Sequence, residues 1–132
     1  MGKKRIICAG TFDILHTGHV KFLKHAKSLA LNAELIVIVA RDDTSEKIKD
    51  KKPMNSQEKR IRAVRALGIA DEVIPGVERE KLIENLAKLK PEIIALGHDQ
   101  WAQESWLKKE LLKHGVKPKI LRLPEYNQSA FP

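Results

Sequence analysis

Five short runs of mostly apolar residues alternate along the chain with segments that carry apolar residues at helical spacing. The second run, residues 35–40, is continuously apolar and rich in β-branched residues, which is typical of a strand covered on both faces of a sheet. Strands that alternate with helices favour right-handed crossovers and a parallel sheet. The sequence therefore predicts an α/β fold with a doubly wound sheet of five parallel strands.

The expected elements follow from the same pattern. Strands are predicted at residues 5–9, 35–40, 72–74, 93–96 and 119–123. The first helix is marked by Phe22, Leu23, Ala26, Leu29 and Ala30, the third by residues 82–89, and the last by Trp106, Leu107, Leu111 and Leu112. Asn55 and Glu58 predict a capping box for a helix that runs through Leu67. The polar segment 43–54 is expected to form a short helix followed by a loop.

Length and composition restrict the class of protein. The chain has 132 residues with 42% apolar residues, which predicts a single folded domain over residues 1–132. Its longest apolar run has six residues, far short of the roughly 20 that cross a bilayer. The basic residues 3–5 precede only four apolar residues, too few for a signal peptide, and Cys8 is the single cysteine. We therefore expect a soluble cytoplasmic protein without a membrane partner or a disulfide framework.

The net charge of +8 comes entirely from the first 70 residues, which carry 15 Lys and Arg against 7 Asp and Glu. Such a field attracts phosphate groups of any kind, although a lysine-rich surface chosen for solubility would look the same. Aromatic residues make up only 5% and do not alternate with the basic clusters. Because single-strand binding usually needs aromatic stacking platforms, a nucleic-acid-binding module is the weaker interpretation.

Three polar segments follow predicted strands, at residues 10–19, 41–43 and 97–100. In a doubly wound sheet, ligands bind beyond the carboxyl ends of the strands, near the point where the strand order switches. The fold brings the three segments to this one edge. The sequence therefore predicts a ligand site there.

The segment after the first strand, residues 10–19, reads GTFDILHTGH and carries the chemistry. His16 and His19 lie at the expected start of a helix, where amide N–H groups and the helix dipole favour an anion. Two imidazoles on that turn are able to donate to one phosphate and to stabilise charge that develops on phosphorus. Simpler interpretations remain: a metal pair completed by Asp13 or His25, a packed helix residue at position 19, or a turn glycine at position 10.

This string resembles the cytidylyltransferase-like family of nucleotidyltransferases, small Rossmann-like enzymes that move a nucleotidyl group to a phosphorylated acceptor. Further similarity lies in residues 39–42, 52–53, 58–60 and 95–100 and in Arg122. Within the family the pattern is most similar to archaeal-type FAD synthetases, which transfer AMP from ATP to FMN. Glycerol-3-phosphate cytidylyltransferases, which use CTP, are similar to almost the same degree.

The resemblance implies roles for individual residues. His16, His19 and a lysine of the mobile segment, Lys49 or Lys52, would contact the triphosphate and the transition state. The remaining nucleotide-binding residues would be Gly10, Thr11, Phe12, Asp13, Gly18, Gly97, Asp99 and Arg122. The acceptor would be bound by Asp42 and Arg60, and the flavin ring would lie against Trp101 or Trp106.

The resemblance also implies ATP as a substrate, Mg²⁺ as the divalent ion, direct attack by the acceptor phosphate without a protein nucleophile, and a homodimer. The sequence shows no carboxylate cluster that would hold the ion, so no protein metal ligand is predicted. The pattern departs from the family after Arg122. Relatives carry a hydroxyl-rich turn there, whereas this chain offers Ser129 alone, which indicates either a shortened chain or weaker phosphate binding at that end.

Overall fold

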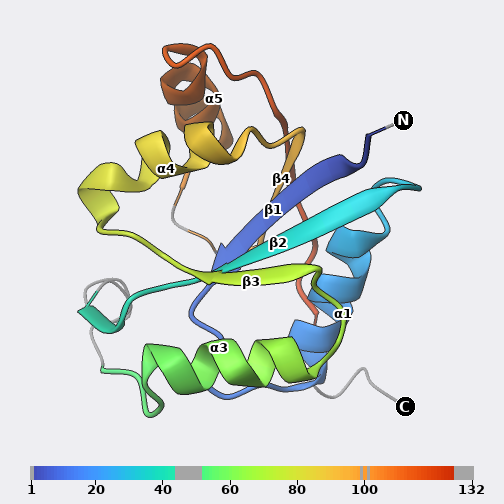
Figure 1. The fold of residues 1–132 in the computed structure, drawn as a ribbon, viewed down its shortest axis with the longest axis vertical. Helices are drawn as coiled ribbons and strands as arrows, with labels where there is room; N and C mark the ends of the chain where they lie inside the picture. The colour runs from blue at the N-terminus through green and yellow to red at the C-terminus, as the bar shows by residue number, and fades with distance from the viewer. Residues whose placement is uncertain (1, 44–51, 99, 101, 127–132) are drawn as a thin grey trace.

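The computed structural model describes residues 2–43, 52–98, 100 and 102–126, which form one sheet with helices on both faces (Figure 1). All pairings between neighbouring strands are parallel, and the strand order is β3-β2-β1-β4-β5. The strands are β1 Lys4–Gly10, β2 Ala33–Val39, β3 Glu72–Pro75, β4 Ile93–Leu96 and β5 Lys119–Arg122. The Rossmann-like, doubly wound five-stranded sheet predicted from the sequence is confirmed.

The helices divide between the two faces of the sheet. Helices α1 (Thr17–Lys27) and α3 (Gln57–Ala66) pack on one face, and α4 (Leu82–Leu89) and α5 (Glu104–Leu112) pack on the other (Figure 1). A short 3₁₀ helix, η1 (Arg79–Lys81), leads into α4. The chain winds outward from β1 to β3 and then returns to place β4 on the other side of β1, so the strand order switches between β1 and β4.

Strand β2 shows why the sheet is buried on both faces. Leu35, Val37 and Val39 point into the core formed with α1 and α3, while Ile36 and Ile38 point into the core formed with α4 and α5. All five side chains are buried. The continuous apolar run in the sequence is therefore two alternating sets of core residues.

Some boundaries differ from the sequence-based expectations. The side chain of Ser56, not Asn55, caps α3, by accepting from the amide of Lys59. Helix α1 ends at Lys27, so Leu29 and Ala30 pack against the core from beyond the helix.

In α5, Leu107 is buried, but Trp106 and Leu112 are 39% and 51% exposed. Most of the segment 43–54, at residues 44–51, lies outside the described residues. No helix among the described residues is long and apolar enough to span a bilayer.

Candidate active site

A cavity of about 730 Å³ lies at the carboxyl ends of β1 and β4, where the strand order switches. Its lining includes the loop after β1, the first turn of α1, the ends of β1 and β4, and parts of α4 and α5. The volume falls within the range of small-molecule sites in proteins. The cavity lies at the predicted edge, and Gly10, Thr11, Phe12, Asp13, His16, Gly18, His19 and Gly97 all contribute to its lining.

His16 and His19 form a reciprocal cap at the N-terminus of α1. The amide of Gly18 donates to Nδ1 of His16 at 3.0 Å, and the amide of His16 donates to Nδ1 of His19 at 3.3 Å. The two ring centroids are 4.0 Å apart. Because both Nδ1 atoms accept hydrogen bonds, a neutral imidazole at either position carries its proton on Nε2. Each ring is therefore oriented as an Nε2–H donor beside the positive end of the helix dipole.

Two glycines are required by close approach in this turn. A Cβ atom at Gly10 would lie 2.9 Å from Cε2 of Phe12, and one at Gly18 would lie 2.4 Å from the carbonyl oxygen of Tyr126. Phe12 itself has φ +53°, a conformation that costs energy for a bulky residue, and its buried ring lies 5.5 Å from that of His19. Packing of the buried Phe12 ring beside His19 thus holds the loop in a tight conformation.

Asp13 ties this loop to the segment before α3. Its carboxylate accepts from the amides of Met54 at 2.8 Å and Asn55 at 2.9 Å, and the side-chain amide of Asn55 donates to the carbonyl oxygen of Asp13 at 2.9 Å. Desolvation raises the pKa of Asp13, but these hydrogen bonds outweigh it and hold the pKa below its usual value. The charged carboxylate therefore orders the loop.

Arg60 is the only buried charged residue in the described part of the chain. Its guanidinium donates to the carbonyl oxygens of Thr11 at 2.8 Å, Ala40 at 2.9 Å and Asn55 at 3.0 Å, and it pairs with Asp42. The side chain does not line the cavity. The structure thus places Arg60 behind the site, where it joins three loop segments, and not on the cavity surface where the resemblance implies acceptor binding.

Arg122 plays a similar part on the other side of the switch point. It donates to the carbonyl oxygens of Gly97 at 2.8 Å, Gln100 at 3.1 Å and Ala102 at 2.7 Å, and to the carboxylate of Glu104 at 3.0 Å. These contacts hold the loop after β4. Arg122 is not among the residues that line the cavity.

The other predicted site residues are spread more widely. Asp42 lines a separate small hollow beside the cavity, with Gln57 and Gly76 among its neighbours. Lys52 is exposed, and Trp106 does not line the cavity. Lys49, Asp99, Trp101 and Ser129 lie outside the described residues.

A metal pair completed by Asp13 or His25 has no support in the geometry. Asp13 accepts from backbone amides, and Nδ1 of His25 hydrogen-bonds the hydroxyl of Tyr126. Among the residues that the structure describes, no three His, Cys, Asp or Glu side chains are grouped so that they could hold a metal ion.

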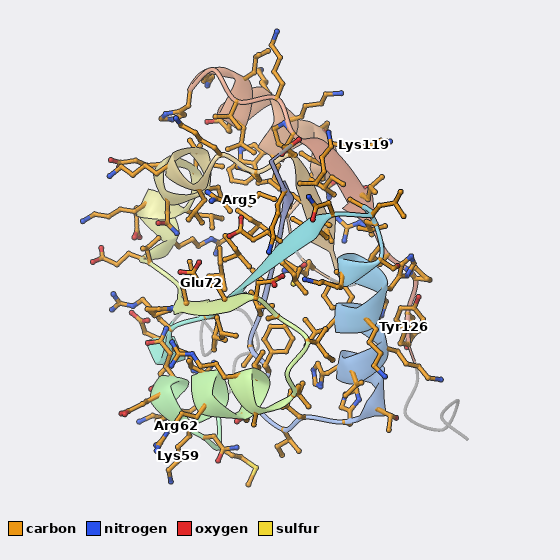
Figure 2. The ribbon with its side chains drawn as sticks, turned by 45° about the vertical axis from the view of Figure 1, so that its right-hand side comes forward. Arg5, Lys59, Arg62, Glu72, Lys119 and Tyr126 are labelled. Carbon is orange, nitrogen blue, oxygen red and sulfur yellow. The ribbon has the colours of Figure 1, made fainter. Side chains whose placement is uncertain are left out.

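Two groups of cavity residues were not predicted. Pro124 and Tyr126 come from the segment after β5, and Figure 2 shows Tyr126 beside α1. Val77, Leu82 and Asn85 line the cavity from the segment between β3 and α4 and from α4 itself. The only signal for the second group is a polar Asn85 within the apolar spacing of residues 82–89. No pattern in the sequence around Pro124 and Tyr126 indicates that these residues line the cavity.

Comparison with known proteins agrees with this geometry. The sequence model of the family described as cytidylyltransferase-like matches residues 7–128. The chain belongs to the cytidylyltransferase-like family. The match includes the loop after β1, the paired histidines and every other segment that lines the cavity.

Relatives of this cytidylyltransferase-like chain include proteins named FAD synthase. The FAD synthase of Korarchaeum cryptofilum (strain OPF8) is 48% identical over 128 residues, covering 96% of this chain and 86% of the relative. That of Pyrococcus abyssi (strain GE5 / Orsay) is 46% identical over 120 residues, covering 91% and 80%. The crystal structure of the lipopolysaccharide core biosynthesis protein from Thermoplasma volcanium GSS1 has a TM-score of 0.87 at 36% identity, covering 96% of this chain and all of that one.

Proposed function

We propose that this protein is an adenylyltransferase that transfers AMP from ATP to FMN and produces FAD and pyrophosphate. The observation that carries the proposal is identity of 42–48% to FAD synthases over 91–96% of the chain. The paired histidines at a cavity of suitable size support the same reaction class. The enzyme class is a nucleotidyltransferase, with ATP and a phosphorylated acceptor as small-molecule substrates.

In this proposal His16 and His19 bind the triphosphate of ATP. Their Nε2–H groups donate to phosphate oxygens, and the amides of the first turn of α1 add to the positive potential. The backbone of residues 10–12 and Gly18 allows the phosphates to approach closely, because neither glycine places a Cβ atom in the way. Donors fixed in this way stabilise the negative charge that develops on the α-phosphoryl group.

The chemical step needs no protein nucleophile. A phosphate oxygen of FMN attacks the α-phosphorus of ATP, and a new P–O bond forms as the bond from the α-phosphorus to the oxygen bridging to the β-phosphorus breaks. Pyrophosphate leaves with that oxygen, opposite the attacking oxygen. The chain's part is to position both substrates in line and to stabilise charge.

Lys52 is proposed as a further phosphate ligand. It lies two residues before Met54, whose amide donates to Asp13, so the backbone near Lys52 is held close to the loop after β1. Mg²⁺ would arrive bound to the phosphates of ATP, because Mg²⁺ usually binds through substrate phosphates and water rather than an all-protein cage. The described residues offer no such cage.

The test is to incubate the purified protein with Mg²⁺ and each pair of ATP or CTP with FMN or glycerol 3-phosphate, and to follow pyrophosphate release and FAD formation. We expect release only with ATP and FMN, with one FAD formed per pyrophosphate. Release with CTP and glycerol 3-phosphate would instead assign a cytidylyltransferase. Nucleotide-independent binding of nucleic acid that weakens steeply with salt, without any pyrophosphate release, would assign a binding module.

We also propose a homodimer, as the resemblance implies. Light scattering on the same preparation would give twice the mass of one chain, and the mass of one chain would contradict it.

A further inference from the structure

The interior of α4 contains one polar residue on its apolar face. Asn85 follows Leu82 by three residues and precedes Leu89 by four, so it shares a helical face with these two leucines, and Leu86 lies on the adjoining face. Leu86 is buried, and Asn85, Leu82 and Leu89 are partly buried. Asparagine is a poor helix former, and an apolar residue would suit this face better. Asn85 therefore needs an explanation other than helix stability.

The side chain of Asn85 lines the cavity. Within the described residues its carboxamide makes no hydrogen bond, whereas the side chain of Gln100, which lines the same cavity, accepts from the amide of Gly97 at 2.8 Å. Because no fully buried side-chain nitrogen or oxygen among the described residues lacks a partner, the carboxamide atoms of Asn85 are open to solvent, and a bound ligand would replace water with its own hydrogen-bonding groups. The geometry is that of a polar group held ready in an otherwise apolar wall.

The two ends of the cavity differ in character. At the α4 end, Val77, Leu82 and Leu86 provide apolar side chains around Asn85, and Arg79 of η1 also contributes to the lining. At the β4 end, Gly97, His98 and Gln100 provide backbone and polar groups, and Arg122 fixes that loop from behind. The histidine pair also contributes to the lining. A cavity with leucine side chains at α4 and exposed backbone groups in the loop after β4 is suited to two different substrates that meet at the phosphates.

We propose that the α4 end of the cavity binds the flavin ring of the acceptor, with the carboxamide of Asn85 hydrogen-bonding the ring's imide edge. This inference rests on the proposed function, since it assigns the acceptor's position. An isoalloxazine ring has an apolar dimethylbenzene end and a pyrimidinedione end, where an N–H lies between two carbonyls. A carboxamide supplies both the acceptor for that N–H and a donor for a carbonyl, and the leucines contact the apolar ring system.

Adenine is the competing occupant, because a carboxamide is also able to pair with an adenine edge. The flavin is favoured because its larger ring system has more apolar surface to place against Val77, Leu82 and Leu86. Adenine then takes the end with polar groups. The two arrangements make opposite kinetic predictions.

The experiment compares Asn85→Leu and Asn85→Asp with Glu84→Gln, an exposed neighbour on the same helix, as the matched control. KM is measured separately for FMN and for ATP, and FMN binding is titrated by quenching of flavin fluorescence. We expect the KM and Kd for FMN to rise roughly tenfold in both Asn85 variants, as for the loss of one or two neutral hydrogen bonds, while the KM for ATP changes less than about twofold. Glu84→Gln should match the wild type.

A chemically altered acceptor makes the test independent of how the variants fold. FMN methylated at the imide nitrogen lacks the N–H, so it should bind the wild type more weakly than FMN does, and Asn85→Leu should no longer distinguish the two. Unchanged FMN affinity in both Asn85 variants would overturn the inference, as would a rise in the KM for ATP alone, which would place adenine at the α4 end. Failure of the wild type to form FAD would overturn the proposed function instead.

Discussion

Each of the two histidines at the start of α1 has a structural role and a proposed chemical role, and the two roles use different ring nitrogens. Each Nδ1 accepts from a backbone amide and so completes the helix cap, while the proton of a neutral ring is on Nε2. If His16 binds phosphate as proposed, a change at His16 therefore alters helix stability and phosphate binding together unless the replacement keeps the acceptor. Asparagine is such a replacement, because it is among the preferred N-cap residues but has no equivalent of Nε2.

We predict that His16→Asn and His16→Ala both lose roughly 10²–10³ in kcat, the usual cost of removing one fixed donor. Only His16→Ala should also lose about 1 kcal/mol of unfolding free energy, because alanine cannot cap the helix. Steady-state kinetics and urea unfolding on the same two variants separate the effects. Wild-type turnover in His16→Asn would remove His16 from the catalytic machinery.

Asp13 predicts a specific pH dependence of stability. Its pKa in the folded protein is lowered, so the charged form is bound more tightly by the fold than the protonated form. The resulting stabilisation is present above the unfolded-state pKa of about 3.9 and is lost as the pH falls through the lower, folded-state pKa. The stability difference between wild type and Asp13→Asn, from urea unfolding at several pH values, should therefore shrink as the pH falls from 5 to 3. A difference that stays constant would contradict the assignment.

Two arginines, Arg60 and Arg122, hold together the loops and helices around the site. Arg60 joins the ends of β1 and β2 to the entry of α3, and Arg122 joins the loop after β4 to the start of α5. Each guanidinium satisfies several backbone carbonyls that regular structure leaves unpaired at strand ends. The loops that line the cavity are thus braced from outside it.

We predict that Arg60→Ala lowers the unfolding free energy by roughly 1–3 kcal/mol, since it leaves three part-buried carbonyl oxygens without their donor and half-exposed Asp42 without its partner. Arg62 is the matched control: it lies on the same helix and is exposed, and Figure 2 shows it pointing away from the sheet. Arg62→Ala should change stability by less than about 0.5 kcal/mol. Thermal and urea unfolding measure the stability of both variants. Equal effects of the two substitutions would show that Arg60 does not hold the loops around the site in place.

The helices and strands were predictable from sequence where the local apolar pattern determines their type and boundaries. They were not predictable where a contact with a distant residue determines them. The apolar run of β2 and the leucines of α4 fix a strand and a helix without further information. The start of α3 was predicted one residue early, because Asn55 and Ser56 are both good caps and only the distant Asp13 decides between them. Of the four residues expected to mark the packed face of α5, Leu107 and Leu111 are buried, whereas Trp106 and Leu112 are 39% and 51% exposed.

At the scale of the whole molecule, the sequence also predicted where the site lies. Alternating strands and helices dictate a sheet edge at which residues 10–19 and 97–100 meet, and the cavity is found there. The contacts that shape the site were not predictable. Arg60 reaches Thr11 across 49 positions and Tyr126 reaches His25 across 101, and no local periodicity encodes such pairs.

A further contact between distant parts of the sequence joins Gly18 and Tyr126, and a substitution at Gly18 tests it. A Cβ atom there would lie 2.4 Å from the carbonyl oxygen of Tyr126 and 2.7 Å from Cε1 of His16, so the backbone or the histidine must move. We predict that Gly18→Ala costs roughly 1–3 kcal/mol of stability, as for overpacking, and raises the KM for ATP. Gly2→Ala is the control, because a Cβ atom at Gly2 meets nothing within 4 Å. Unchanged KM and unfolding free energy in Gly18→Ala would show that the segment after β5 does not bear on the site.

The contact between Gly18 and Tyr126 has a consequence for the order in which a ribosome delivers the protein. The histidine turn leaves the exit tunnel early, but the residue that covers Gly18 follows more than 100 residues later. At about 5–20 residues per second, that delay amounts to several seconds or more. For most of that interval β1, the centre of the sheet, has no β4 to pair with, because β4 begins only at Ile93. The histidine turn therefore emerges uncovered, and Tyr126 is able to cover Gly18 only after almost all of the described chain has been made.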